Sequence, residues 1–102
     1  MAQVSQTPAA QDRLQGKIDH YLDYELGAWR SVPEHAARWP EMDAVDREAF
    51  HLHWSGVTEA YLRELERWAG EGRLSPAQLA EYRRLQALVA QHRPTLEALL
   101  AE

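Results

Sequence analysis

The segment from Asp43 to Ala69 constrains the fold most, because its apolar residues are spaced as in one long helix. At about 100° per residue, six large apolar side chains fall on about one third of the helical circumference. They are Phe50, Trp54, Val57, Tyr61, Leu65 and Trp68. A helix with such a stripe buries it, so we expect the rest of the chain to cover this face.

The opposite face of this predicted helix is also apolar in its N-terminal half. Its small or apolar residues are Val45, Ala49, Leu52 and Gly56. A helix that is apolar on two sides packs against other protein segments on both sides. We therefore predict an interaction surface that comprises these four residues and Trp39, and that binds a second copy of the chain or another protein. Further along, Glu59 and Arg63 have the spacing of an exposed ion pair.

Two more helices are predicted on either side of this segment, over residues 9–30 and 76–100. Ser75 and Gln78 match a capping box with Pro76 at the first helical position, and Asp43 is placed to cap the middle helix. Pro94 interrupts the last helix, where a proline removes one backbone hydrogen bond and favours a kink.

The connection between the first two helices is predicted to contain a short helical turn over about 32–38, because Ser31 and Glu34 match a second capping box. Residues 1–8 read as a flexible tail. The expected fold is therefore all-α, a small antiparallel bundle of three main helices plus this turn, in one domain over residues 9–102.

The charge, the cysteine content and the hydropathy of the chain exclude several classes of function. The chain carries 16 acidic and 11 basic side chains, a net charge of −5. Phosphate binding needs a basic face, so DNA is not an expected partner. The absence of cysteine excludes disulfides and zinc–thiolate sites. The sequence shows neither a membrane-spanning apolar run nor a signal peptide, so we expect a cytoplasmic protein without membrane contact.

One set of polar residues suggests an alternative function in metal binding. Glu48 and His51 form a Glu-x-x-His pair, which is similar to one local pattern of di-iron carboxylate bundles. Glu25 and His92 fall on the core faces of the first and last helices. Together the four residues offer ligands for iron, manganese or zinc, assembled across a dimer. In the other interpretation Glu25 pairs with Arg47, or it bonds a tyrosine hydroxyl or a tryptophan N–H, and no cofactor is bound.

A second resemblance rests on two residues. Arg47 and His53 have a spacing that resembles the Arg-x(4–6)-His motif of HEPN-type helical ribonucleases, although Glu48 stands where that motif usually has Asn, Asp or His. The resemblance implies RNA cleavage by this pair. Because the sequence carries no complete catalytic set, we favour a non-enzymatic interaction or regulatory module that associates with itself.

Overall fold

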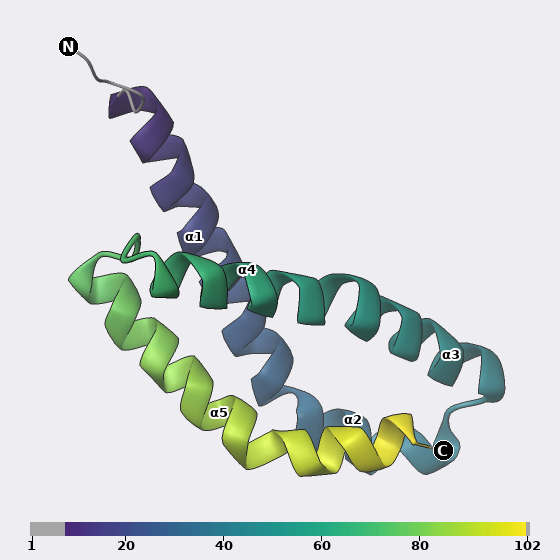
Figure 1. The fold of residues 1–102 in the computed structure, drawn as a ribbon. Helices are drawn as coiled ribbons and strands as arrows, with labels where there is room; N and C mark the ends of the chain where they lie inside the picture. Colours follow the sequence, from purple (N-terminus) through teal and green to yellow (C-terminus); the bar gives the residue numbers. More distant parts are fainter. Residues whose placement is uncertain (1–7, 102) are drawn as a thin grey trace.

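The computed structural model describes residues 8–101, and its regular elements are all helices (Figure 1). Helix α1 spans Pro8–Arg30 and α2 spans Val32–Arg38, followed by a 3-10 turn at Trp39–Glu41. A long rod then comprises α3 (Ala44–His53), a π-helical turn (Trp54–Thr58) and α4 (Glu59–Gly70). The last helix, α5, spans Pro76–Leu100. The predicted all-α class is confirmed, while residues 1–7 of the predicted tail lie outside the described residues.

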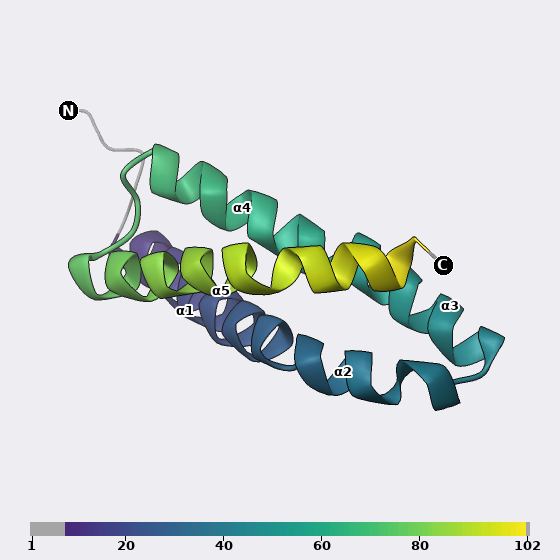
Figure 2. The ribbon, with the colours of Figure 1, turned by 90° about the horizontal axis from the view of Figure 1, so that it is seen from below.

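The core lies where α1, α4 and α5 meet. Helix α5 packs against α1 and α2, and α1 packs against α4. Figure 2 shows α5 between the rod of α3 and α4 on one side and α1 with α2 on the other. The buried residues are Ile18, Leu22, Leu26, Trp29, Val32, Trp54, Leu62, Leu65, Trp68, Tyr82, Leu85 and Leu96. Each large apolar side chain buried in this way contributes about 1.5–3 kcal/mol.

The molecule is elongated, with extents of 59 × 24 × 17 Å. Its radius of gyration is 16.4 Å, whereas a compact domain of this length has about 13 Å. The α3 end of the rod accounts for part of this length, because α3 lies at one end of the molecule (Figure 1). No helix within residues 8–101 is long and apolar enough to cross a membrane.

Two of the three predicted helix caps are confirmed. The Asp43 side chain accepts a hydrogen bond of 2.8 Å from the backbone N–H of Asp46. Ser75 and Gln78 form the complete capping box, with bonds of 2.9 and 3.1 Å. The predicted capping box at Ser31 is wrong. Ser31 itself has helical backbone angles, and its hydroxyl donates backwards to the carbonyl of Ala28 at 2.7 Å, because α2 follows α1 almost without a break.

The helix that was predicted over residues 43–69 is continuous from Ala44 to Gly70, but a π-helical turn within it shifts its helical phase. A π turn takes up more residues than an α turn, so every later side chain is rotated. Consequently Thr58 and Leu62 face the core, with 0% and 5% of their surface exposed, while Val57 and Tyr61 of the predicted stripe are only half-buried. The Thr58 hydroxyl lies 3.2 Å from the hydroxyl of Tyr24 in α1, which gives this buried polar group a partner.

Helix α5 remains one helix across Pro94. Figure 1 shows it changing direction in its second half. A proline ring displaces the carbonyl four residues earlier, here that of Ala90, and cannot bond to it. The bend lets the end of α5 follow α2, against which it packs.

Candidate functional site

The outer face of α3 is exposed along its length. No residue of α3 is fully buried, in contrast to the other α-helices of the described chain. Val45 and Leu52 are 76% and 66% exposed, and they are the large hydrophobic residues that the described chain leaves exposed. Ala49 and Gly56 are exposed beside them. We call these four residues the outer face; their helical spacing makes one apolar stripe rather than scattered apolar positions.

The inner side of α3 holds the helix in place. The Phe50 ring stacks on Trp54 with a centroid distance of 5.5 Å and meets the edge of Trp39 at 5.4 Å. The Arg47 guanidinium donates two hydrogen bonds, of 2.6 and 3.1 Å, to the backbone carbonyl of Trp39. These contacts fix α3 from one side and leave its outer face uncovered. Trp39 differs from the other predicted surface residues, since it is 5% exposed and lies beneath Arg47.

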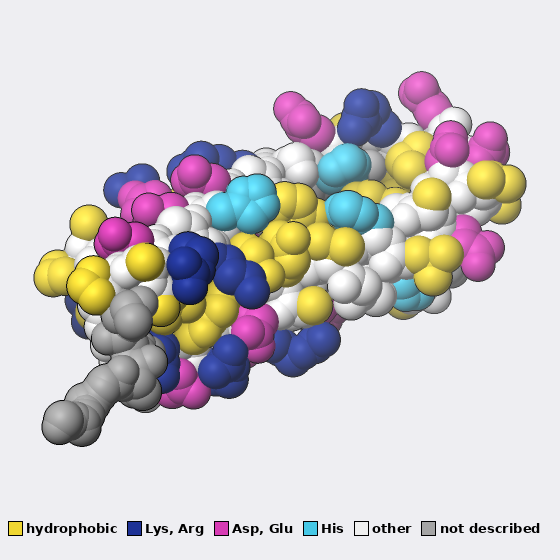
Figure 3. Space-filling model, turned by 90° about the horizontal axis from the view of Figure 1, so that it is seen from above, with side chains coloured by type: hydrophobic (Ala, Val, Ile, Leu, Met, Phe, Trp, Pro, Cys, Tyr) yellow, Lys and Arg dark blue, Asp and Glu magenta, His cyan; other side chains and the backbone are white. Residues whose placement is uncertain are grey.

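Figure 3 shows how charge is distributed around this end of the molecule. Hydrophobic side chains reach the surface at the right-hand end, where α3 lies, with acidic side chains beside them. Histidines lie nearer the middle of the same face. The sequence of α3 has the same order: Asp46 and Glu48 come first, and His51 and His53 follow.

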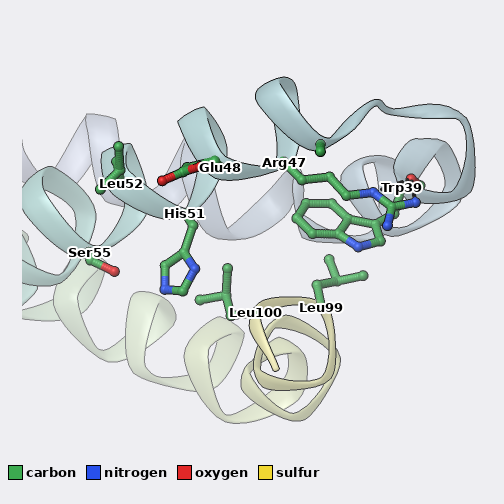
Figure 4. A pocket seen from close by; sticks show the side chains of 9 residues that line it. Trp39, Arg47, Glu48, His51, Leu52, Ser55, Leu99 and Leu100 are labelled. Carbon is green, nitrogen blue, oxygen red and sulfur yellow. Dashed lines mark hydrogen bonds between the residues drawn. The ribbon is translucent and has the colours of Figure 1, made fainter. Parts of the chain in front are cut away.

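A cavity of about 610 Å³ opens between the rod and the end of α5. Its walls include Glu48, His51 and Ser55 from the rod and Leu100 from α5 (Figure 4). Figure 4 shows the His51 ring pointing toward Leu100, whereas Leu52 points away from α5. Leu52 nevertheless lines the rim of this cavity, so the cavity and the outer face adjoin each other along α3.

The structure brings together two of the four residues in the metal hypothesis. Glu48 and His51 share the cavity wall. Glu25 is instead buried in the core, and His92 lies on α5. Within residues 8–101 no group of three or more His, Asp or Glu side chains is placed to hold one metal ion. A site that draws ligands from two copies of the chain stays a prediction.

Glu25 is fully buried, as the sequence predicts from its place in the apolar stripe of α1. Its Oε1 accepts a hydrogen bond of 3.2 Å from the indole N–H of Trp29, one turn further along. Its Oε2 has no hydrogen-bond partner within the described chain. Burial raises the pKa of the Glu25 carboxyl to about 8, and the negative charge of Glu59 raises it further, against the lowering effect of the Trp29 bond. The group is therefore mostly neutral at pH 7.

The structure distinguishes the three alternative partners of Glu25. The tryptophan N–H is its partner, and the predicted pair with Arg47 is wrong. Arg47 turns instead to the carbonyl of Trp39, which the 3-10 turn presents beside α3.

A polar cluster around Trp29 joins three parts of the chain. The Arg93 guanidinium of α5 lies 5.0 Å from the centre of the Trp29 ring and donates to Glu59 Oε2 at 3.2 Å. The indole N–H of Trp54 donates to the same oxygen at 3.2 Å, and the two indoles meet edge to face. Glu59 is thus half-buried and bound to Arg93, so the predicted exposed pair with Arg63 is wrong. Helical spacing finds partners within one helix, whereas this cluster depends on how α1, α4 and α5 pack.

The two residues of the ribonuclease resemblance do not meet at one site. Arg47 lines the cavity beside α5 and binds the Trp39 carbonyl. His53 lines a different cavity beside α1, where its Nε2 is hydrogen-bonded to the Tyr24 hydroxyl. Both side chains are held by structural contacts on different sides of α3, so the geometry gives this resemblance no support.

Comparison with protein-family models, with curated proteins and with solved structures finds no match to this chain.

Proposed function

We propose that this protein is a non-enzymatic interaction module that associates with a second copy of itself through the outer face of α3. The exposure of Val45 and Leu52, on a helix that buries none of its residues, is the observation that supports this proposal. Burying a valine or leucine side chain contributes about 1.5–3 kcal/mol. In a symmetric pair the same patch is used on both copies, so each of these residues is buried once in either copy.

The way α3 is anchored supports the same function. Phe50 and Arg47 attach the helix through its inner side, so a partner on the outer face would displace no contact within the chain. Two polar side chains of α3 have structural roles. Arg47 binds the Trp39 carbonyl and His53 binds the Tyr24 hydroxyl, and this use of both groups favours a binding surface over a catalytic one.

We expect Leu52→Glu to convert a dimer into a monomer. Two carboxylates would be buried in each symmetric interface, and a buried charge without a partner is costly. The dissociation constant should rise at least about 100-fold, which corresponds to about 3 kcal/mol. Helical content should stay unchanged, because Leu52 is 66% exposed within one chain. Sedimentation velocity over a concentration series and circular dichroism measure the two quantities.

Ala87→Glu is the matched control, since Ala87 is an exposed residue of α5 and receives the same charge. It should leave the dissociation constant unchanged. A wild-type protein that stays monomeric at every concentration would refute the proposed function, as would a Leu52→Glu dimer as stable as the wild type.

A further inference from the structure

We infer that the two copies pair through α3 in antiparallel orientation, so that the large residues of one outer face lie against the small residues of the other. The inference rests on the proposed self-association and specifies its geometry. Three features of the rod support it: the order of residue sizes on the outer face, the open space at Gly56 and the order of charges along α3.

Residue size alternates along the outer face. Val45 is large, Ala49 small, Leu52 large and Gly56 the smallest. Read in the opposite direction, the same series becomes small, large, small, large. An antiparallel pair therefore sets Val45 against Gly56 of the second copy and Leu52 against Ala49, so that the surfaces interlock. A parallel pair would set leucine on leucine and glycine on glycine, which leaves a gap at the glycine level.

Gly56 lies in the π-helical turn, and no other side chain of the described chain packs against it. It lies within the helical rod and has no positive φ, in contrast to Gly72. A Cβ added to Gly56 would meet no atom within 4 Å. Glycine inside a helix costs roughly 0.5–1 kcal/mol relative to alanine. In the proposed pair this glycine allows the close approach of a partner side chain, and Val45 of an antiparallel second copy supplies that side chain.

Charge along α3 favours the same orientation. Asp46 and Glu48 lie in its first half on either side of Arg47, which leaves that half with one net negative charge, and the formally neutral His51 and His53 lie in its second half. A parallel pair brings the two acidic halves together, which is repulsive. An antiparallel pair brings each acidic half beside the histidine half of the other copy, and it also opposes the two helix dipoles favourably.

Cysteine trapping distinguishes the two orientations, and the chain has no cysteine of its own to interfere. Positions 45 and 56 are about 16 Å apart along a helix that rises 1.5 Å per residue. A disulfide requires the two Cα atoms to lie within about 7 Å. In an antiparallel pair, Val45→Cys reaches Gly56→Cys of the second copy but cannot reach its own counterpart. In a parallel pair each variant reaches its own counterpart and not the other.

Three samples are oxidised: the Val45→Cys variant, the Gly56→Cys variant, and an equal mixture of the two. In the mixture one variant carries a mass tag. We expect at least tenfold more tagged–untagged disulfide dimer in the mixture than like-with-like dimer in either single sample. Strong like-with-like dimers from both variants would overturn the antiparallel orientation. Absence of trapping in all three samples would overturn it as well if sedimentation shows a dimer, because the interface would then lie elsewhere. Absence of any dimer in sedimentation would instead refute the proposed function.

A second pair of variants keeps the test independent of cysteine chemistry. Gly56→Ala and Gly16→Ala both add a methyl group to an exposed helical glycine with open space around it. Gly56→Ala should weaken the dimer about tenfold, because the methyl group meets Val45 of the second copy. Gly16→Ala should leave the dissociation constant unchanged. Equal dissociation constants for the two variants would overturn the contact between Gly56 and Val45.

Discussion

Replacement of Glu25 by glutamine is expected to stabilise the protein at neutral pH, and the gain is expected to grow as the pH rises. In the folded chain the Glu25 carboxyl is buried and keeps its proton up to about pH 8, whereas its ordinary pKa is 4.5. Between these values the folded state binds one proton more than the unfolded state. The free energy of unfolding of the wild type therefore falls with rising pH, by about 1.4 kcal/mol per unit from this group alone.

Glutamine removes this pH dependence and keeps the main contact. Its amide oxygen can accept the Trp29 N–H bond as Oε1 does now. Its amide nitrogen replaces an oxygen that already has no partner in the described chain. We expect Glu25→Gln to match the wild type near pH 4.5 and to be more stable by roughly 3 kcal/mol at pH 7. Above about pH 8 the difference should reach a plateau, because the carboxyl is then ionised in both states.

Urea unfolding followed by tryptophan fluorescence at pH 5, 6, 7 and 8 measures this effect, with all proteins at one concentration because association shifts apparent stability. Glu97→Gln, on the exposed side of α5, is the matched control and should show little change with pH relative to the wild type. A Glu25→Gln gain that is the same at pH 5 and pH 8 would show that the carboxyl is not held neutral by the fold.

The helices could be predicted from the sequence because their signals are local. The capping box at Ser75 and the cap at Asp43 depend on residues only three positions apart, and both form as predicted. The burial of Glu25 could also be predicted, since helical angle alone places it among apolar neighbours.

Features that depend on contacts between helices could not be predicted in this way. The π-helical turn brings Thr58 rather than Val57 into the core, and its partner is the hydroxyl of Tyr24, 34 positions away. The pairing of Glu59 with Arg93 has the same origin, because the two residues meet only once α5 has folded back on the rod. The exposure of the outer face could be predicted only in part. Its apolar pattern is local, but only the packed structure shows that nothing in the described chain covers Leu52.

Replacement of Trp29 by alanine is expected to have the largest effect on stability of any change proposed for this chain. The indole is 0% exposed and contacts three different elements. It donates to Glu25, meets Trp54 edge to face at 4.9 Å, and lies under the Arg93 guanidinium. Tryptophan-to-alanine changes in a core cost about 3–5 kcal/mol through lost burial and the cavity left behind. A domain of this size has about 5–15 kcal/mol in total, so the variant should lose a large share of its stability.

Trp39→Ala is the matched control, because Trp39 is also buried, at 5% exposure, but lies outside the main core cluster. Its loss should remove the Phe50 edge contact and the ring beneath Arg47, which loosens α3 rather than the whole bundle. We expect Trp29→Ala to cost at least 2 kcal/mol more than Trp39→Ala in urea unfolding. Equal losses would mean that the core does not depend on the junction at Trp29.

Trp29→Phe separates the size of the ring from its N–H group. Phenylalanine keeps most of the apolar volume but leaves both carboxyl oxygens of Glu25 without a partner. The Trp29 bond lowers the pKa of Glu25, so its loss should raise that pKa further. Trp29→Phe should therefore cost more at pH 9, where the folded wild type carries an ionised Glu25, than at pH 7, where that group is mostly neutral. In a Glu25→Gln background this pH dependence should vanish, and its persistence there would assign it to another group.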